Sequence, residues 1–198
     1  GVAADKGYYG AGGTGFRLAT VATCMYLAYE HLLRLNEVVR TQTGTAADKD
    51  PLQWDDVQFW DASGELLGWD TEGRPLGLPS LMTMRMPPSK TDQLGLRQEV
   101  LRSPFPKGWE NGAALNAAGP AMWRYMRQYP VRRERAGYTP LFRQERTECS
   151  ARLTKAVFMT AFHKLCRKAG IQYSAYGTHC FRVGGVNRLM DLGATAPQ

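Results

Sequence analysis

The stretch from Phe16 to Leu33, FRLATVATCMYLAYEHLL, restricts the fold more than any other part of the chain. Apolar residues and good helix formers dominate it, with few charged residues to mark a solvent-facing side. A helix of this kind must be covered by other elements on most of its surface. A chain of 198 residues is long enough to supply that cover from one substantial core. The sequence therefore predicts a buried helix at the centre of a globular domain.

The rest of the chain predicts shorter helices and a small sheet around this helix. A Gly-rich lead occupies residues 1–13, and a single domain is expected over residues 14–198. Strand-like pieces are predicted at residues 56–60, 81–86 and 97–103, and the last two flank PPSKTDQLG, whose composition favours a hairpin turn. Helices are predicted at residues 34–41, 120–129, 151–169 and 179–192, and the chain is expected to contain no internal repeat. The predicted fold class is mainly α with a small antiparallel β-sheet, an α+β domain.

Charge is segregated along the chain. There are 25 Lys and Arg against 18 Asp and Glu, a formal net charge of +7. Residues 50–73 hold seven acids and no Lys or Arg, whereas residues 124–146 hold seven arginines and two acids. A basic second half of this kind can neutralise several phosphates of a nucleic-acid backbone. The alternative is that these runs are ordinary solvated helix faces.

The cysteines and histidines indicate no metal centre or disulfide framework. The four cysteines form no CxxC pair, and His163, Cys166, His179 and Cys180 match no common zinc-site spacing. No run of about 18 apolar residues predicts a membrane span, and the first residues lack the plan of a signal peptide. We expect a soluble intracellular protein, cytoplasmic or nuclear, with reduced thiols and no membrane contact.

The segment YGTHCFRVGGVNRL predicts an anion site at a helix start. Thr178 has the hydroxyl of an N-cap, and the spacing places His179 and Arg182 on one face of the first turn. A helix start offers unpaired N–H groups and the positive end of the helix dipole. A guanidinium and an imidazole at that point favour a phosphate as the ligand.

Two further positions carry cations where the predicted elements end. Arg34 follows the long apolar helix, and Lys90 lies at the tip of the predicted hairpin. Each has an ordinary alternative: Arg34 paired with Glu37 on the surface, and Lys90 facing solvent in a turn.

Taken in order, these pieces resemble the catalytic domain of the tyrosine recombinase (phage integrase) family. HLLRLNEVVR followed by LQWDDVQF resembles its arginine-then-Glu helix leading into the first strand, and SKTDQLG resembles its hairpin lysine. THCFRVGG resembles its His-x-x-Arg box, preceded by PLF and the basic helix LTKAVFMTAFHKLCRKAGI. The resemblance spans about residues 14 to 198. The segments SKTDQ and THCFRVGG resemble those of the integrase-like recombinases of mobile elements.

The resemblance implies DNA strand cleavage and rejoining by transesterification through a 3′-phosphotyrosine. Arg34 and Arg182 would clamp the phosphate, since a forked guanidinium matches its oxygens. His179 would hydrogen-bond the phosphate and assist proton transfer, and Lys90 would protonate the leaving 5′ oxygen. Glu37 would orient these groups without touching DNA. The resemblance implies no metal or cofactor, double-stranded DNA as partner, and a dimer or tetramer on DNA for the full-length protein.

The chain departs from the family at its end. None of its nine tyrosines occupies the position of the nucleophile, so residues 14–198 are interpreted as an incomplete catalytic domain. One alternative is a non-catalytic DNA-binding module of the same fold. Another is an ordinary helical domain whose cations point toward separate surfaces.

Overall fold

The computed structural model describes residues 13–39, 52–86, 100–112, 117–147, 150–172, 176–177 and 179–193. Five α-helices lie within these ranges: α1 (Gly13–Glu30), α2 (Leu35–Val38), α3 (Ala118–Gln128), α4 (Lys155–Lys168) and α5 (Cys180–Asp191). Three strands form one sheet: β1 (Val57–Trp60), β2 (Leu81–Arg85) and β3 (Val100–Pro104). Three 3-10 helices complete the described elements: η1 (Trp54–Asp56), η2 (Trp109–Asn111) and η3 (Arg133–Tyr138). The predicted α+β class is confirmed.

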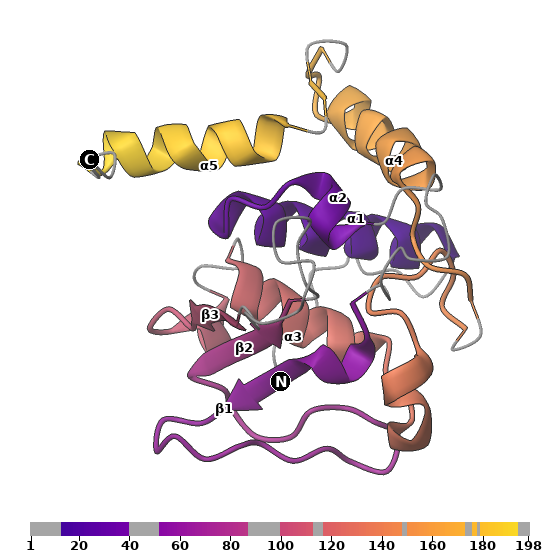
Figure 1. The fold of residues 1–198 in the computed structure, drawn as a ribbon, viewed down its shortest axis with the longest axis vertical. Coiled ribbons are helices and arrows are strands. Elements are labelled where there is room, and N and C mark those ends of the chain that lie inside the picture. The colour runs from indigo at the N-terminus through magenta and orange to yellow at the C-terminus, as the bar shows by residue number, and fades with distance from the viewer. Residues whose placement is uncertain are drawn as a thin grey trace, which may run out of the picture.

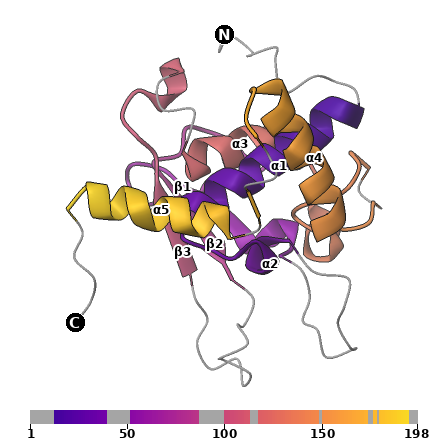
Figure 2. The same ribbon diagram turned by 90° about the horizontal axis from the view of Figure 1, so that it is seen from above.

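Helix α1 is the central element, as the sequence predicts. It packs against α3 on one side and against α4 and α5 on the other, and Figures 1 and 2 show α5 crossing it. Two threonines of α1 are buried, and the hydroxyl of each donates a hydrogen bond within the helix. Thr20 Oγ1 donates to Phe16 O at 2.8 Å, and Thr23 Oγ1 donates to Ala19 O at 2.9 Å. Burial also raises the pKa of the Cys24 thiol well above its usual value.

The sheet is antiparallel in the order β1-β2-β3. Its register pairs Val57 with Met84 and Met84 with Leu101, so that alternate residues of the three strands share a face. The inner face holds the buried side chains Phe59, Met82 and Met84, which join the core. The predicted strand positions are confirmed to within one to three residues, and the predicted hairpin tip at residues 87–99 lies outside the described residues.

A tandem repeat follows β1, and the expectation of no internal repeat is wrong. WDASGELLG (residues 60–68) is followed at once by WDTEGRPLG (residues 69–77), with Trp, Asp, Gly, Leu and Gly at matching positions. Each copy forms the same turn. Asp61 Oδ1 accepts the N–H groups of residues 63 and 65 at 2.8 and 2.9 Å, and Asp70 Oδ1 accepts those of residues 72 and 74 at 2.9 and 2.8 Å. The pKa of the Asp61 carboxyl is lowered mainly by the Ser63 hydroxyl, which donates to Oδ1 at 2.6 Å, and then by the backbone N–H groups. The pKa of the Asp70 carboxyl is lowered mainly by the backbone N–H of Arg74.

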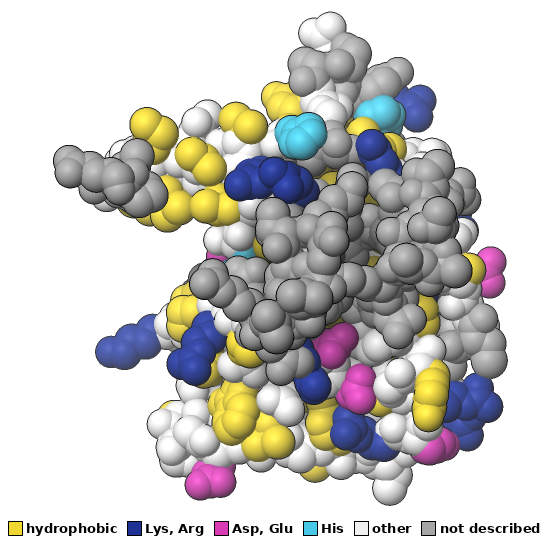
Figure 3. Space-filling view, viewed as in Figure 1, with side chains coloured by type: hydrophobic (Ala, Val, Ile, Leu, Met, Phe, Trp, Pro, Cys, Tyr) yellow, Lys and Arg dark blue, Asp and Glu magenta, His cyan; other side chains and the backbone are white. Residues whose placement is uncertain are grey.

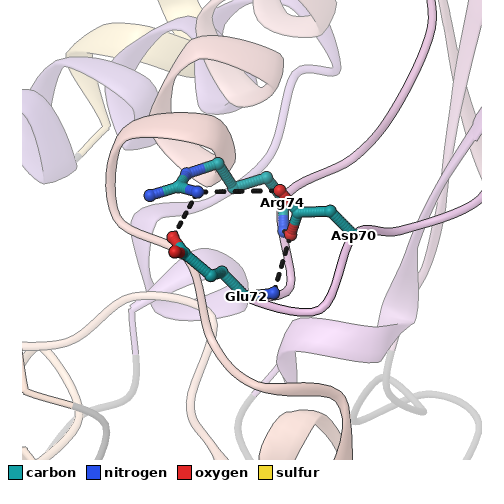
Figure 4. Close-up of polar contacts among 3 residues, drawn as sticks. All are labelled: Asp70, Glu72 and Arg74. Atoms are coloured by element: carbon teal, nitrogen blue, oxygen red, sulfur yellow. Dashed lines mark hydrogen bonds and ion pairs between the residues drawn. The ribbon is translucent and has the colours of Figure 1, made fainter.

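The two copies differ in what surrounds their turns. Both turn glycines have a positive φ, 85° at Gly64 and 80° at Gly73, which favours glycine. A Cβ at Gly64 would meet nothing within 4 Å, whereas one at Gly73 would collide with the backbone carbonyl of Val131. Figure 4 shows the second turn, where the Arg74 guanidinium pairs with both Asp70 and Glu72. The turn of the second copy therefore packs against the backbone of Val131, whereas the turn of the first copy has free space around its glycine.

The first copy also protects the edge of the sheet. Leu67 N–H donates to Phe59 O at 2.8 Å, so residues that follow the turn pair with the end of β1. An unpaired strand edge is a site for association with other chains, and this short pairing covers part of it.

A buried arginine corrects the interpretation of the basic second half as a set of surface charges. Arg143 is fully buried, with its guanidinium 5.7 Å from the ring centre of Phe16 and 5.4 Å from that of Trp54. Its Nη2 donates to Tyr129 O at 3.1 Å, while Nε and Nη1 have no hydrogen-bond partner among the described residues. Burial, opposed by the nearby charge of Arg143, raises the pKa of Tyr125 to about 12. Arg143 thus belongs to the core and is not available to DNA.

Candidate functional site

The candidate site begins where α1 ends. Leu32 has φ 54°, and Leu33 N–H reaches back to Ala28 O at 2.9 Å, a bond that closes the helix terminus with a left-handed residue. The turn buries Leu33 and Leu35 and leaves Arg34 exposed between them. Helix α2 then starts at Leu35, inside the predicted helix of residues 34–41. The sequence position of Arg34 at a helix junction is thereby confirmed.

The residues just before Arg34 connect three other parts of the fold. Glu30 Oε2 accepts the N–H of Ala118 at 2.7 Å and so supplies the first turn of α3 with a carboxylate. His31 Nε2 lies 2.6 Å from Ser103 Oγ on β3. Leu32 and Tyr29 contact α5. Each contact joins α1 to a different element within four consecutive residues.

The His31 side chain is largely buried in this junction, and burial disfavours its charged form. Desolvation lowers its pKa, and the Glu30 carboxylate, whose Oε1 is 4.0 Å from His31 Nε2, acts in the opposite direction. Its side chain is only 10% exposed. The tautomer of the ring determines whether Nε2 donates to Ser103 Oγ or accepts from it.

Helix α5 docks on the same end of α1 through two glycines. A Cβ at Gly185 would collide with the backbone carbonyl of Tyr29 and approach Leu32 Cδ2 to 2.6 Å, so only glycine allows this contact. A Cβ at Gly184 would lie 3.3 Å from Tyr29 Cε2. Arg182 lies three residues before Gly185, on the adjoining face of the helix. Gly185, three residues after Arg182, therefore lies against Leu32, which is two residues before Arg34.

The start of α5 is fixed by an aromatic cluster. Phe181 is buried, with its ring centre 5.2 Å from that of Phe162 and 6.0 Å from that of Phe158, both on α4. His179 and Arg182 are exposed on either side of it, and neither side chain has a hydrogen bond or ion pair with any described residue. Figure 3 shows Lys, Arg and His side chains gathered where α5 meets α4.

The capping prediction for α5 is wrong. Its N-cap is His179, with φ −91° and ψ −14°, and the His179 side chain makes no capping hydrogen bond. Thr178 lies outside the described residues. The described part of the helix start thus shows no side-chain cap, and the helix has no acid in its first turn. An anion bound there would meet both the helix N–H groups and the two cationic side chains.

The structure describes Arg34, His179 and Arg182 and places two of their segments close together. Gly185, three residues after Arg182, packs against Leu32, two residues before Arg34, and His179 is the N-cap of the same helix. Lys90 lies outside the described residues, as does the side chain of Glu37. The contacts of Glu30, His31 and Ser103 could not be predicted from the sequence, since nothing in their local pattern indicates contacts between residues so far apart.

The cysteines of this region are thiols. Cys166 on α4 is buried, Cys180 on α5 is partly buried, and both are free. Burial is the main cause that raises the pKa of each thiol. Among the described residues, no group of three or more His, Cys, Asp or Glu is arranged to hold a metal ion.

Comparison with known proteins gives no assignment. The chain matches no protein-family model, no curated protein and no solved structure. Within the described ranges, none of the helices combines the length and apolar character that crossing a membrane requires.

Proposed function

We propose that this domain binds double-stranded DNA and forms the core of a tyrosine-recombinase-like strand transferase. Arg34 and Arg182 clamp one backbone phosphate, and His179 hydrogen-bonds it. In the reaction, a tyrosine hydroxyl oxygen attacks phosphorus, its proton passes to His179, and the bond between phosphorus and the 5′ oxygen breaks. Lys90 supplies the proton that the leaving oxygen needs. Negative charge grows on the non-bridging oxygens during this step, and the two guanidinium groups stabilise it.

The docking of α5 on α1 is the observation that supports this proposal. Arg34 and Arg182 are separated by 147 intervening residues in the sequence. Even so, Gly185 packs against Tyr29 and Leu32 and brings their backbone segments together. The exposed side chains of His179 and Arg182 have no hydrogen bond or ion pair with the described residues, so both can bind an anion from solution.

The binding half of the proposal is tested by fluorescence anisotropy with labelled duplex DNA at several salt concentrations. Removing one phosphate contact with Arg182→Ala should weaken binding and reduce the salt slope by about 1. Arg188→Ala is the matched control, because it removes the same charge from the exposed far end of the same helix. Equal effects of the two variants would refute a specific role for Arg182.

The alternative is a DNA-binding module of the same fold without chemistry. A small external nucleophile such as hydrogen peroxide can be supplied with a duplex whose scissile 5′ oxygen is replaced by sulfur. Thiolate leaves without a proton, so cleavage should then survive Lys90→Ala but be lost in Arg182→Ala. Binding without any cleavage of this substrate favours the module.

A further inference from the structure

Two cysteines lie where the end of α4 meets the start of α5. Phe158, Phe162 and Cys166 follow one another at intervals of four residues along α4, so they form one row on its buried face. The ring of Phe181 on α5 packs against the first two members of this row, with ring centres 6.0 and 5.2 Å apart. Cys166 is the third member, and Cys180 directly precedes Phe181 in the chain. One helix contact therefore carries a thiol on each side.

The surroundings of the two thiols agree with this placement. Cys166 belongs to the hydrophobic core, Cys180 packs against that core, and both are free. Burial is the main cause that raises the pKa of Cys180, and the charge of a Cys166 thiolate adds to it, so the two sulfur atoms are near each other. Figure 1 shows α5 starting near the end of α4 at which the chain leaves that helix.

We propose that Cys166 and Cys180 form a reversible disulfide on reaction with a small-molecule disulfide, and that this bond attaches the start of α5 to α4. The Cys180 thiolate, the less buried of the two, attacks one sulfur of the oxidant and displaces a thiolate. The Cys166 thiolate then attacks the Cys180 sulfur of the mixed disulfide and displaces the second thiolate. The two cysteines thereby lose two protons and two electrons, and the oxidant is reduced to two thiols.

The bond would act on a helix that has few buried contacts. Of the described residues of α5, only Phe181 and Gly185 are buried, and His179 and Arg182 lie on either side of Phe181. A disulfide that closes the short span from Cys166 to Cys180 limits the freedom of this segment when α5 opens. The attachment of α5 to α4 does not depend on the proposed function, whereas its effect on DNA binding does.

Oxidation with hydroxyethyl disulfide, followed by peptide mass spectrometry, tests the pairing. The original protein should lose the mass of two hydrogens and yield linked peptides that carry Cys166 and Cys180, and dithiothreitol should reverse the change. Cys166→Ser and Cys180→Ser should each give only mixed disulfides with the reagent. Cys149→Ser is the control, because it removes a cysteine and keeps both members of the pair, and it should still form the bond.

A disulfide requires Cα atoms within about 7 Å of each other. An original protein that forms mixed disulfides alone, or a bond to another cysteine, would therefore overturn the proposal.

Amide hydrogen exchange tests what the bond does to α5. The α5 amides should exchange at least about threefold more slowly in the oxidised than in the reduced protein, with those of α3 unchanged. Cys166→Ser treated with the same reagent should show no slowing, and Cys180→Ser serves if the buried position does not accept serine. Unchanged α5 exchange in a protein that carries the bond would overturn the attachment. Equal slowing in α3 and α5 would also overturn it, because that result indicates a general gain in stability.

Duplex binding measured at rising temperature tests the consequence for the site, which rests on the proposed function. If α5 must stay docked to bind DNA, oxidation should raise the temperature at which half of the binding is lost by at least about 2 °C, with no shift in Cys166→Ser. A lower temperature after oxidation would overturn the attachment. If the bond forms and slows α5 exchange while this temperature is unchanged, the disulfide stands and the role of α5 in the proposed function fails.

Discussion

Replacing Gly185 with alanine should lift α5 from the end of α1, whereas the same change at Gly184 should not. Both glycines lie inside α5, so alanine gains about 1 kcal/mol of helix propensity at either position. At Gly185 the new methyl group collides with the Tyr29 carbonyl and approaches Leu32 Cδ2 to 2.6 Å. At Gly184 it meets only the edge of the Tyr29 ring at 3.3 Å, and Tyr29 is exposed enough to move.

The expected magnitude follows from these contacts. Adding a methyl group to a packed site costs about 1–3 kcal/mol, so Gly185→Ala should be less stable than Gly184→Ala by about that amount. The loss has an upper limit, because α5 can detach. Phe181 is its main buried side chain, and exposing it costs about 1.5–3 kcal/mol.

Amide exchange in α5 and DNA anisotropy measure both effects. Gly185→Ala should speed exchange throughout α5 and weaken DNA binding, while Gly184→Ala leaves both near their original values. Equal stability and equal α5 exchange in the two variants would refute the docking geometry on which the site depends.

Three further predictions concern stability, measured by urea unfolding. Gly73→Ala should lower the free energy of unfolding by about 1–3 kcal/mol more than Gly64→Ala. Both glycines have a positive φ, but only a methyl group at Gly73 would collide with the Val131 carbonyl. Equal losses of stability in the two variants would contradict this difference. Arg143→Met should be as stable as the original protein or more so, because it removes two buried nitrogen atoms, Nε and Nη1, that have no hydrogen-bond partner among the described residues. Arg143→Ala should lose about 2–4 kcal/mol, and an equal loss in Arg143→Met would indicate an anionic or polar partner of the guanidinium. Burial lowers the pKa of His31, so below about pH 6.5 the unfolded chain takes up a proton that the folded protein resists, and stability should fall as the pH drops from 7 through this window. His31→Gln should reduce the dependence of the unfolding free energy on pH in this range. An unchanged pH dependence would show that another group is responsible for it.

The sequence predicted the elements that have a local signature. The apolar composition of residues 16–33 identified the central helix, and the strand-like pieces identified the positions of β1, β2 and β3. Helix α5 ends at Asp191, within one residue of the predicted end, and Gly193 follows it with φ 85°. Helix α4 begins four residues later than predicted, because Thr154 caps it by accepting the Val157 N–H at 3.4 Å.

The features that could not be predicted from the sequence depend on contacts between residues far apart in the chain. Burial of Arg143 requires Phe16 and Trp54 to meet around it, and no local pattern separates it from the exposed arginines near it. The His31–Ser103 contact is of the same kind. The tandem turns differ: their nine-residue period is visible in the sequence and could have been found by aligning the chain with itself.

A double-mutant cycle on DNA affinity tests most directly whether Arg34 and Arg182 act on one phosphate. Arg34→Ala, Arg182→Ala and the double variant are measured against the same duplex at fixed salt. Shared contact with one phosphate predicts a double variant whose loss falls short of the sum of the single losses by about 1 kcal/mol or more. Losses that add to within about 0.5 kcal/mol would show that the two guanidinium groups act independently, and would contradict the single cationic site.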